Sequence, residues 1–524
     1  MPSFLGKDRH QIEWIRRIGL TAYFLFALRF LCGQVGIEKR KAKNTCRIKL
    51  IMKTEFSQTE APLFEELARY SGKPLISFHT PGHKRGAGLE PEWHRPGFTA
   101  GIDLTEITAL DWQGALEKAQ LLAARFFKSD RCLFLTQGAS QGLIGALAGA
   151  FAPGEKVLVA RNCHLSVIKG MIIAGLTPVF IETEILPDWG IPSVLSERDL
   201  RAKIQKNPDY KGLIVTNPTY QGIAGRVQKY RDLIGAKILI LDEAHGGHLG
   251  WSGLDGYNAF EAADLWVQGT HKILGSFTQT GMLHLREKRL EPGSIQQGVD
   301  LISTTSPSYV LLASLDSNRR FLATTGAGLF REKSPELKKL RSQIANYDGV
   351  RILEDISSEV IVDPWKITLS FLDSGFTGRQ AAAILEREFR IQPEYADYNQ
   401  VTCLIAPWQA ESDLQALLRA VAVICNRKTG RLKPLNCFPE SIPPQALPIR
   451  EAFFAPKPAV SLEQAIGRIA SRIIAPYPPG VPLLVPGELI GIAEVETIQQ
   501  LLSAGGLVRG LEPDGKISVV KENG

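Results

Sequence analysis

Short apolar runs alternate with helix-like segments through the middle of this 524-residue chain, and this alternation limits the possible folds more than any other feature. Each run is bounded by Gly, Pro, Asn or Asp, which is the usual setting of a buried strand. Two of the intervening segments, residues 115–127 and 140–151, read as helices. The predicted strands are residues 132–135, 157–160, 178–181, 213–216, 238–241 and 265–268.

Strands that alternate with helices predict a mostly parallel sheet that is buried on both faces, and therefore an α/β fold. In such folds the chemistry lies beyond the carboxyl ends of the strands, in the loops that follow them. Functional side chains are therefore expected directly after the apolar runs.

Two breaks in the pattern predict where the first domain ends. Gly326-Ala-Gly328 and Ser334-Pro335 favour a boundary near residue 325, so residues 52–325 are expected to form the large domain. Residues 326–435 are then a small α+β domain with a strand at 366–372. A Pro-rich stretch, residues 436–458, opens a last domain that runs from 436 to 524.

The basic character of the chain is confined to its start. The net charge is +7, but residues 1–53 carry 12 Lys and Arg against 3 Asp and Glu, and the remainder carries 49 basic and 51 acidic residues. This distribution argues against a nucleic-acid surface on the main body. The seven cysteines are scattered without a C-x-x-C pair, which indicates a reducing compartment, no disulfide framework and no metal site.

The basic start also contains an apolar run, residues 18–28, preceded by Arg16 and Arg17. Arg29 interrupts it, and it is too short to span a bilayer. No small-residue cleavage site of the kind that ends a signal peptide is recognisable. We expect residues 1–51 to be an extension outside the folded enzyme, disordered or non-native, with the ordinary chain starting at Met52.

Two strand ends carry an acid and an amine. Asp242 ends the run 238–241, and Lys272 lies just past the run 265–268 in a segment without acidic residues. Adjacent strand ends would present both groups to one crevice. Pyridoxal phosphate chemistry needs a lysine that forms a Schiff base and an acid beside the pyridine nitrogen. It also needs a phosphate cradle, and Gln137-Gly-Ala-Ser-Gln-Gly142 follows a strand and opens a helix.

Each of these signals is weak by itself. A lysine after a strand is usually a solvated surface residue, an aspartate at a strand end is usually a cap or turn residue, and Gly-Ala-Ser usually allows tight helix packing. Their occurrence together, in the order cradle, acid and lysine, is much more specific.

Over residues 52–524 the chain resembles the bacterial ornithine/lysine/arginine decarboxylases of the aspartate-aminotransferase fold, especially their shorter members. Several long motifs carry the resemblance: Phe78-His-Thr-Pro-Gly-His-Lys-Arg-Gly86, Asp103-Leu-Thr-Glu-Ile-Thr-Ala-Leu-Asp111, Arg161-Asn-Cys-His164, Asn217-Pro-Thr-Tyr220, Asp242-Glu-Ala-His-Gly246, Thr270-His-Lys272, Thr304-Thr-Ser-Pro-Ser-Tyr309, Tyr477-Pro-Pro-Gly-Val-Pro482 and Pro486-Gly-Glu488.

The resemblance implies roles for the catalytic residues. Lys272 would hold pyridoxal 5'-phosphate covalently, and Asp242 would keep the pyridine nitrogen protonated. His164 would stack on the ring, although without its motif a core or surface histidine is the better interpretation. His245 would lie near the cofactor's phenolic oxygen or the substrate carboxylate, and a structural histidine behind the site is an equal alternative.

The resemblance also implies a phosphate site that two subunits share. Gly138, Ala139 and Ser140 would bind the phosphate with help from Thr270 and His271. Thr305 and Ser306 would reach the phosphate of the neighbouring subunit, which implies a homodimer or a higher homo-oligomer; the alternative is a helix start at Ser306-Pro307. Three positions depart from the family pattern: Gly269 replaces serine, Leu165 replaces lysine and Ile273 replaces threonine.

These features predict a cytoplasmic decarboxylase of a basic amino acid in polyamine biosynthesis, with arginine favoured and lysine or ornithine open, and with no membrane partner. The substrate's distal cation needs a buried acidic partner. Glu488 is the first candidate, with a solvated loop carboxylate as its alternative, and Glu106 is the second. Other hypotheses are another reaction on this scaffold, such as transamination or aldol cleavage, and a membrane-tethered or regulatory homologue without activity.

Overall fold

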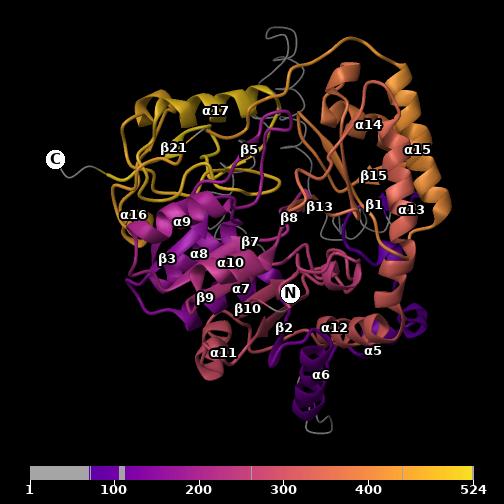
Figure 1. Ribbon diagram of the computed structural model, residues 1–524, viewed down its shortest axis with the longest axis horizontal. Coiled ribbons are helices and arrows are strands. Elements are labelled where there is room, and N and C mark those ends of the chain that lie inside the picture. The colour runs from indigo at the N-terminus through magenta and orange to yellow at the C-terminus, as the bar shows by residue number, and fades with distance from the viewer. Residues whose placement is uncertain (1–69, 71, 105–111, 261, 440, 522–524) are drawn as a thin grey trace, which may run out of the picture.

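The computed structural model describes residues 70, 72–104, 112–260, 262–439 and 441–521. Figure 1 shows three bodies: a large α/β domain, a smaller domain beside the long helices α13 and α15, and a C-terminal domain that contains α17. The predicted extension, residues 1–51, lies outside the described residues. In the part of the chain that is described, no helix is both long enough and apolar enough to cross a membrane.

The large domain is built on a seven-stranded sheet in the order β2-β11-β10-β9-β7-β3-β4. The strands from β10 to β4 run parallel, and β11 is antiparallel to both of its neighbours. The strands are β2 (Arg131–Leu135), β3 (Lys156–Ala160), β4 (Thr177–Ile181), β7 (Gly212–Thr216), β9 (Ile238–Asp242), β10 (Leu265–Gln268) and β11 (Gly281–Leu285). The predicted α/β fold is therefore confirmed.

The strands are apolar throughout because both faces of the sheet are buried. In β3, Val157 and Val159 belong to one core, whereas Leu158 and Ala160 belong to the core on the opposite face. The first face is covered by α7 (Gly138–Ala150), α8 (Leu165–Ala174) and α11 (Pro292–Asp300). The second is covered by α6 (Trp112–Phe126), α9 (Glu197–Lys206) and α10 (Val227–Ile234).

All six strands and both helices predicted for this domain are present, with ends within three residues of those expected. The prediction missed β11, whose sequence Gly-Met-Leu-His-Leu contains a polar residue in a short run. His284 is tolerated there because it is buried against Trp266, with the two rings stacked at a centroid distance of 5.1 Å.

The boundary predicted near residue 325 falls within helical structure. Helix α12 (Tyr309–Phe321) continues through a π-helical turn, Leu322–Gly326, into α13 (Ala327–Ala345). Gly326 takes ordinary right-handed helical dihedrals, and Pro335 lies inside α13. The glycines and the proline therefore do not end the helix, because burial of Leu322, Phe330 and Leu337 stabilises it.

The small domain has an antiparallel sheet in the order β12-β14-β17-β16, covered by α13, α14 and α15. It is tied to the rest of the chain by two further pairings, β1 with β15 and β8 with β13. The bounds are β1 (Ile76–Phe78), β8 (Ile223–Gly225), β12 (Arg351–Ile352), β13 (Val360–Val362), β14 (Lys366–Ser370), β15 (Ile391–Pro393), β16 (Tyr395–Ala396), β17 (Val401–Leu404), α14 (Gly378–Phe389) and α15 (Glu411–Asn426).

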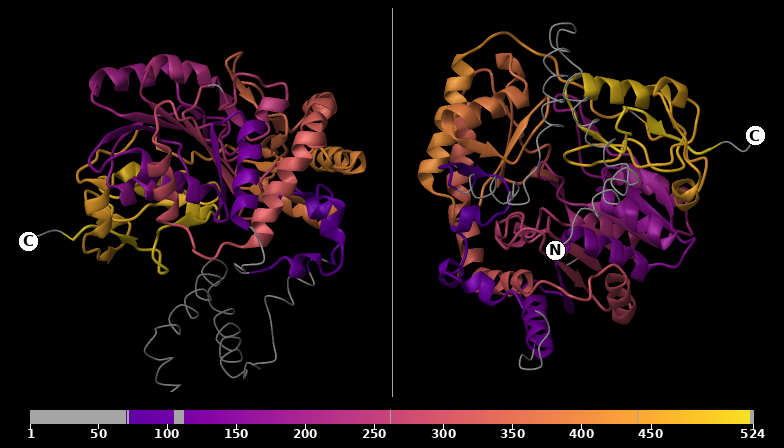
Figure 2. Two further views of the ribbon diagram at one scale, coloured as in Figure 1. Left: turned by 90° about the horizontal axis from the view of Figure 1, so that it is seen from below. Right: turned by 180° about the vertical axis from the view of Figure 1, so that it is seen from behind.

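The C-terminal domain has its own apolar core and packs on the large domain through α16 and α8. Figure 2 shows it against the large domain from two further sides. Its elements are α16 (Ile449–Phe454), β18 (Ala459–Val460), β19 (Ala475–Pro476), α17 (Ile492–Ser503), β20 (Val508–Arg509) and β21 (Ile517–Ser518). Other short elements are α5 (Phe98–Gly101), β5 (Ile185–Leu186), β6 (Ile191–Pro192) and the 3-10 helices η1 (Lys84–Gly86), η2 (Pro91–His94), η3 (Leu249–Trp251), η5 (Leu372–Ser374) and η6 (Glu463–Ala465).

Candidate active site

A cavity of about 700 Å³ lies at the carboxyl ends of the central strands. Loops after β3, β7, β9 and β10 and the first turn of α7 form its floor. Its walls are completed by residues from outside the central sheet and its helices: His79 and Thr80, Gln392 to Glu394, Tyr477 to Val481, and Arg509. All three domains therefore contribute to this one site.

Lys272 and Asp242 meet in this cavity, as the sequence predicts. Asp242 is the last residue of β9, and its Oδ1 accepts a hydrogen bond of 3.1 Å from the Ala244 amide. Burial lowers the pKa of Lys272, against the opposing effects of Asp242 and Glu394. Burial raises the pKa of Asp242, against the opposing effect of Lys272. A lysine with a lowered pKa is more often neutral, which is the nucleophilic form.

His245 touches the lysine. Its Nε2 lies 2.8 Å from Lys272 Nζ, and its ring makes an edge contact with Tyr220 at a centroid distance of 4.9 Å. Burial, and after it the positive charges of Lys272 and Lys366, lower the pKa of His245 well below its usual value. His245 is therefore a neutral imidazole at the wall of the cavity.

His164 also lines the cavity, from the amino end of α8. Its Nδ1 accepts a hydrogen bond of 3.2 Å from the Ser166 amide, which fixes the ring as the cap of the helix. Burial lowers its pKa to about 4, with a further lowering by Lys272. The neighbouring departure, Leu165, packs near Gly480 of the C-terminal domain, where an added Cβ would lie 3.5 Å from Leu165 Cγ.

The first turn of α7 offers an anion site. Gly138, Ala139 and Ser140 line the cavity, and no side chain caps this end of the helix. The backbone N–H groups of a first helical turn have no partners within the helix, so they can bind phosphate. Gly138 has a φ of +74°, and an added Cβ there would meet nothing within 4 Å.

His271 lines the same cavity, and its Nδ1 lies 2.7 Å from the Thr280 carbonyl oxygen. Gly269 allows the loops after β9 and β10 to approach each other, because an added Cβ would lie 2.9 Å from the Ala244 carbonyl oxygen. The serine that the family pattern has at this position would therefore require a shift of the loops.

Three predicted site residues do not line the cavity. Thr270 is fully buried and donates to Thr280 Oγ1 at 3.1 Å, away from the residues that line the cavity, so its predicted contact with the cofactor is not supported. Thr305 and Ser306 are exposed in the loop before α12 and do not line the cavity of their own subunit. Their reach into a neighbouring subunit stays a prediction.

The prediction that Glu488 reads the substrate is wrong. Its carboxylate is fully buried and accepts hydrogen bonds of 2.6 and 3.0 Å from Arg161, and the Val485 amide donates to it at 2.8 Å. Glu488 does not line the cavity, and these contacts engage both of its oxygens. Its alternative, a solvated loop carboxylate, is equally contradicted. Glu106, the second candidate, lies outside the described residues.

Glu394 is an acidic residue of the wall that sequence reasoning missed. It follows β15, and its oxygens accept a hydrogen bond of 2.6 Å from the Thr80 amide and one of 3.1 Å from the Tyr220 hydroxyl. Tyr220 lies in a recognised motif but had no assigned role. No local pattern marks Glu394, because the pairing of β15 with β1, more than 300 residues earlier, brings it to the site.

These groups fit a phosphate-bearing aromatic cofactor. The anion site, the acid and the lysine line one cavity. Three buried atoms of its lining residues, Asn162 Oδ1, Thr216 Oγ1 and His245 Nδ1, have no hydrogen-bond partner within the described part of the chain. Buried polar atoms are usually paired, so these three atoms indicate a bound group.

Comparison with known proteins gives a consistent result. Residues 61–367 match the sequence profile of the Orn/Lys/Arg decarboxylase major domain, and residues 450–510 match that of the C-terminal domain. The chain is 34% identical to an arginine decarboxylase of Halalkalibacterium halodurans, over 89% of this chain and 99% of the relative. It is 32% identical to an arginine decarboxylase of Bacillus subtilis, with the same coverage.

More distant relatives share the fold. Lysine decarboxylase LdcA of Pseudomonas aeruginosa is 24% identical over 93% of this chain and 79% of its own. The structure of the constitutive lysine decarboxylase of Escherichia coli has a TM-score of 0.69 at 19% identity, covering 88% of this chain and 82% of that one. Pyridoxamine-pyruvate aminotransferase of Mesorhizobium loti has a TM-score of 0.53 at 16% identity, over 69% of this chain and 94% of that one.

Proposed function

This chain belongs to the Orn/Lys/Arg decarboxylase family and is an amino-acid decarboxylase, and we propose that it removes CO₂ from arginine with pyridoxal 5'-phosphate as its cofactor. One observation carries the proposal: the lysine, the acid and the open helix terminus that the reaction needs all line one cavity. Relatives that are 32–34% identical over most of the chain are named arginine decarboxylases, and this favours arginine over lysine or ornithine.

The cofactor's place follows from the groups that are available to hold it. Gly138, Ala139, Ser140 and His271 would bind its phosphate, Asp242 would face its ring nitrogen, and Lys272 would attach it. When bound, pyridoxal phosphate supplies an electron sink for the electron pair that decarboxylation leaves on the substrate. Asp242 is suited to this because it is buried, and a buried carboxylate is stabilised by an adjacent cation such as a protonated ring nitrogen.

Proton movements fall to Lys272 and His245. The amine and the imidazole Nε2 are 2.8 Å apart, within the range of direct proton transfer. His245 stays neutral in the working pH range, so its Nε2 can accept a hydrogen bond from the Lys272 amine and orient the amine's lone pair. His164, fixed as a helix cap, supplies one wall against which a flat ring can rest.

Glu394 is the proposed partner of the substrate's distal cation. It lies in the same cavity as Lys272, and the Thr80 amide and the Tyr220 hydroxyl hold its carboxylate in place. A buried carboxylate held by two donors is prepared to bind a guanidinium or ammonium group, because little reorganisation is needed. This residue takes the role that the sequence assigned to Glu488.

The proposal extends to a homodimer in the cytoplasm that serves polyamine biosynthesis. Exposed Thr305 and Ser306 support the dimer, because they are available to the phosphate site of a neighbouring subunit. Sedimentation of the purified protein tests the oligomeric state, and a Thr305→Ala/Ser306→Ala variant with weakened cofactor binding would support a shared site.

Product analysis on purified protein is the main test. With arginine, the expected products are CO₂ and agmatine, at a higher kcat/KM than for lysine or ornithine. A keto acid would indicate transamination, and release of an aldehyde from a β-hydroxy amino acid such as threonine would indicate aldol cleavage. The absence of any product from all three substrates, with cofactor bound, would support a homologue without activity and would refute the proposal.

A further inference from the structure

Lys366 is a buried lysine directly behind the cavity. It begins β14 of the small domain, its side chain is 2% exposed, and it does not line the cavity. Its Nζ donates a hydrogen bond to the Tyr220 carbonyl oxygen and lies 5.4 Å from the centre of the Tyr220 ring. A fully buried lysine is costly unless it is paired, so its position requires an explanation.

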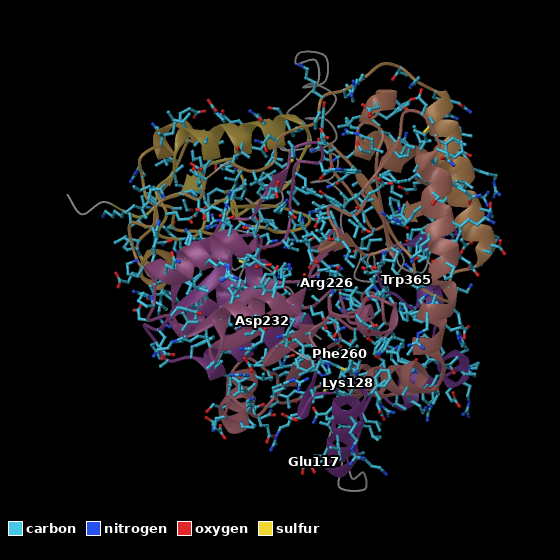
Figure 3. The ribbon with its side chains drawn as sticks, in the orientation of Figure 1. Glu117, Lys128, Arg226, Asp232, Phe260 and Trp365 are labelled. Atoms are coloured by element: carbon cyan, nitrogen blue, oxygen red, sulfur yellow. The ribbon has the colours of Figure 1, made fainter. Side chains whose placement is uncertain are left out.

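Asp363 is the acidic neighbour of Lys366, and its contact with His248 joins two domains. Asp363, three residues earlier, contacts His248 Nε2 at 3.0 and 3.1 Å, and both side chains are fully buried. Burial acts to raise the pKa of Asp363, but His248 and then Lys366 hold it below its usual value. Burial lowers the pKa of Lys366 to about 7, while Asp363 and Glu394 act to raise it. Trp365 lies between helix α13 and the large domain (Figure 3), and the centre of its ring is 6.4 Å from the centre of the His248 ring.

The loop that carries Tyr220 packs against Asp363 and Lys366. The Asp363 amide donates to the Gly222 carbonyl oxygen at 2.8 Å. Gly222 has a φ of +95°, and an added Cβ would lie 3.1 Å from both Asp363 Cβ and Lys366 Cδ. The loop therefore has no room to shift toward Lys366, and the hydrogen bond from Lys366 Nζ to the Tyr220 carbonyl oxygen holds its backbone.

Tyr220 connects Lys366 to two residues that line the cavity. Its hydroxyl donates to Glu394 Oε1 at 3.1 Å, and its ring makes the edge contact with His245. A continuous set of contacts thus runs from Lys366 through Tyr220 to the carboxylate that faces the cavity. Lys366 itself does not line the cavity, so its contact with the substrate side runs through Tyr220.

We propose that Lys366 is a positioning residue for substrate specificity: by fixing Tyr220, it holds Glu394 where it can bind the distal cation of the substrate. This inference rests on the proposed function of Glu394. A purely structural role would be served by any residue that fills the space, whereas positioning of Glu394 requires the hydrogen bond to Tyr220. The two roles therefore differ in what they do to the preference between a cationic substrate and a neutral one.

The test compares arginine with citrulline, which replaces the guanidinium by a neutral ureido group of similar shape. Lys366→Met keeps the volume and leaves Asp363 paired with His248, so the variant is expected to fold. Its ratio of kcat/KM for arginine over citrulline should fall about tenfold, the size of coupling within one hydrogen-bond network. Lys366→Arg, which keeps a charged donor, should retain most of the ratio.

Four further variants separate positioning from general damage. Thr368→Val, in the same strand, loses a buried hydrogen bond of 3.0 Å to Thr402 and should leave the ratio unchanged. Glu394→Gln should lower the ratio by itself, and adding Lys366→Met to it should lower the ratio no further. If Lys366→Met does not fold, Gly222→Ala, which crowds Lys366 Cδ, replaces it with the same expected loss.

Binding of agmatine, measured by calorimetry, gives a readout that needs no turnover. Its dissociation constant should rise about tenfold in Lys366→Met and stay unchanged in Thr368→Val. Equal agmatine affinity in wild type and Lys366→Met, or an equal loss of the substrate ratio with and without Glu394, would overturn the inference. Failure of the wild-type enzyme to turn over any basic amino acid would instead refute the proposed function.

Discussion

The amine of Lys272 lies 2.8 Å from Nε2 of His245, and both groups are buried in the same cavity wall. Burial lowers the pKa of both residues, and the positive charge of Lys272 lowers the pKa of His245 further. The site therefore holds a lysine that is more often neutral beside a neutral imidazole, whose Nε2 can accept a hydrogen bond from the amine and orient it.

The first prediction concerns the point of covalent attachment. Borohydride reduction of the protein with pyridoxal phosphate bound should fix the cofactor on Lys272, read as a mass increase on one peptide. Lys84 and Lys366 are internal controls, because burial lowers the pKa of each to about 7 as well. A modified peptide centred on either control would show that the attachment site is assigned wrongly.

The second prediction concerns His245. Replacing it by Asn should lower kcat by about 10²- to 10⁴-fold if it moves protons, as is usual for general acid–base groups. Because the pKa of His245 is already well below 6.5, wild-type activity should show no loss from its protonation between pH 6 and 8. A rate profile that rises steeply across this range, and flattens in His245→Asn, would contradict a neutral histidine.

The third prediction separates chemistry from binding at Asp242. Asp242→Asn keeps the size of the side chain but removes the charge that would hold a ring nitrogen protonated. Activity should fall by more than about a hundredfold, which is about 2.7 kcal/mol of barrier, while cofactor affinity changes much less. Fluorescence titration of the apo-protein with pyridoxal phosphate measures the affinity. Near-normal turnover would place the acid partner elsewhere.

The strand-end residues were predictable because the signal for them is local. Asp242 and Lys272 each follow an apolar run, and a parallel sheet brings the ends of neighbouring strands together whatever the details of packing. His164, which is proposed to stack on the ring, likewise lies in the loop after β3. For these residues, the order of strands in the sheet affects only which neighbours they have, and not the edge at which they lie.

The surroundings of Glu488, Glu394 and Lys366 were not predictable, because long-range packing places these residues. Glu488 follows Pro-Gly, which locates a turn but does not indicate where the carboxylate points, and its partner Arg161 is 327 residues away. Glu394 reaches the cavity through the pairing of β15 with β1, and Lys366 reaches the Tyr220 loop through the junction between two domains. Long-range packing leaves no pattern in a single sequence.

The fourth prediction is a pH dependence of stability. Burial raises the pKa of Glu243 to about 8, so between pH 4.5 and 8 the folded state holds a proton that the unfolded state has released. Stability should therefore fall as the pH rises through this range. Glu243→Gln should flatten the slope, measured as the thermal midpoint against pH. Glu291→Gln, at an exposed residue, should leave the slope unchanged. An unaltered slope in Glu243→Gln would show that Glu243 is ionised in the folded protein.

The last prediction concerns the buried pair that sequence reasoning had assigned to substrate binding. Arg161 Nη1 and Nη2 donate to the two oxygens of Glu488, which ties the loop after β3 to the C-terminal domain. Glu488→Gln should leave Arg161 without its counter-charge, at a cost of about 3–5 kcal/mol in the free energy of unfolding, because an uncompensated buried charge remains. The arginine-to-citrulline ratio should stay at its wild-type value, since Glu488 does not line the cavity. Denaturant unfolding measures the first effect. Arg161→Met/Glu488→Leu, which removes both charges, should recover most of the lost stability. A changed substrate ratio at unchanged stability in Glu488→Gln would show that Glu488 binds the substrate.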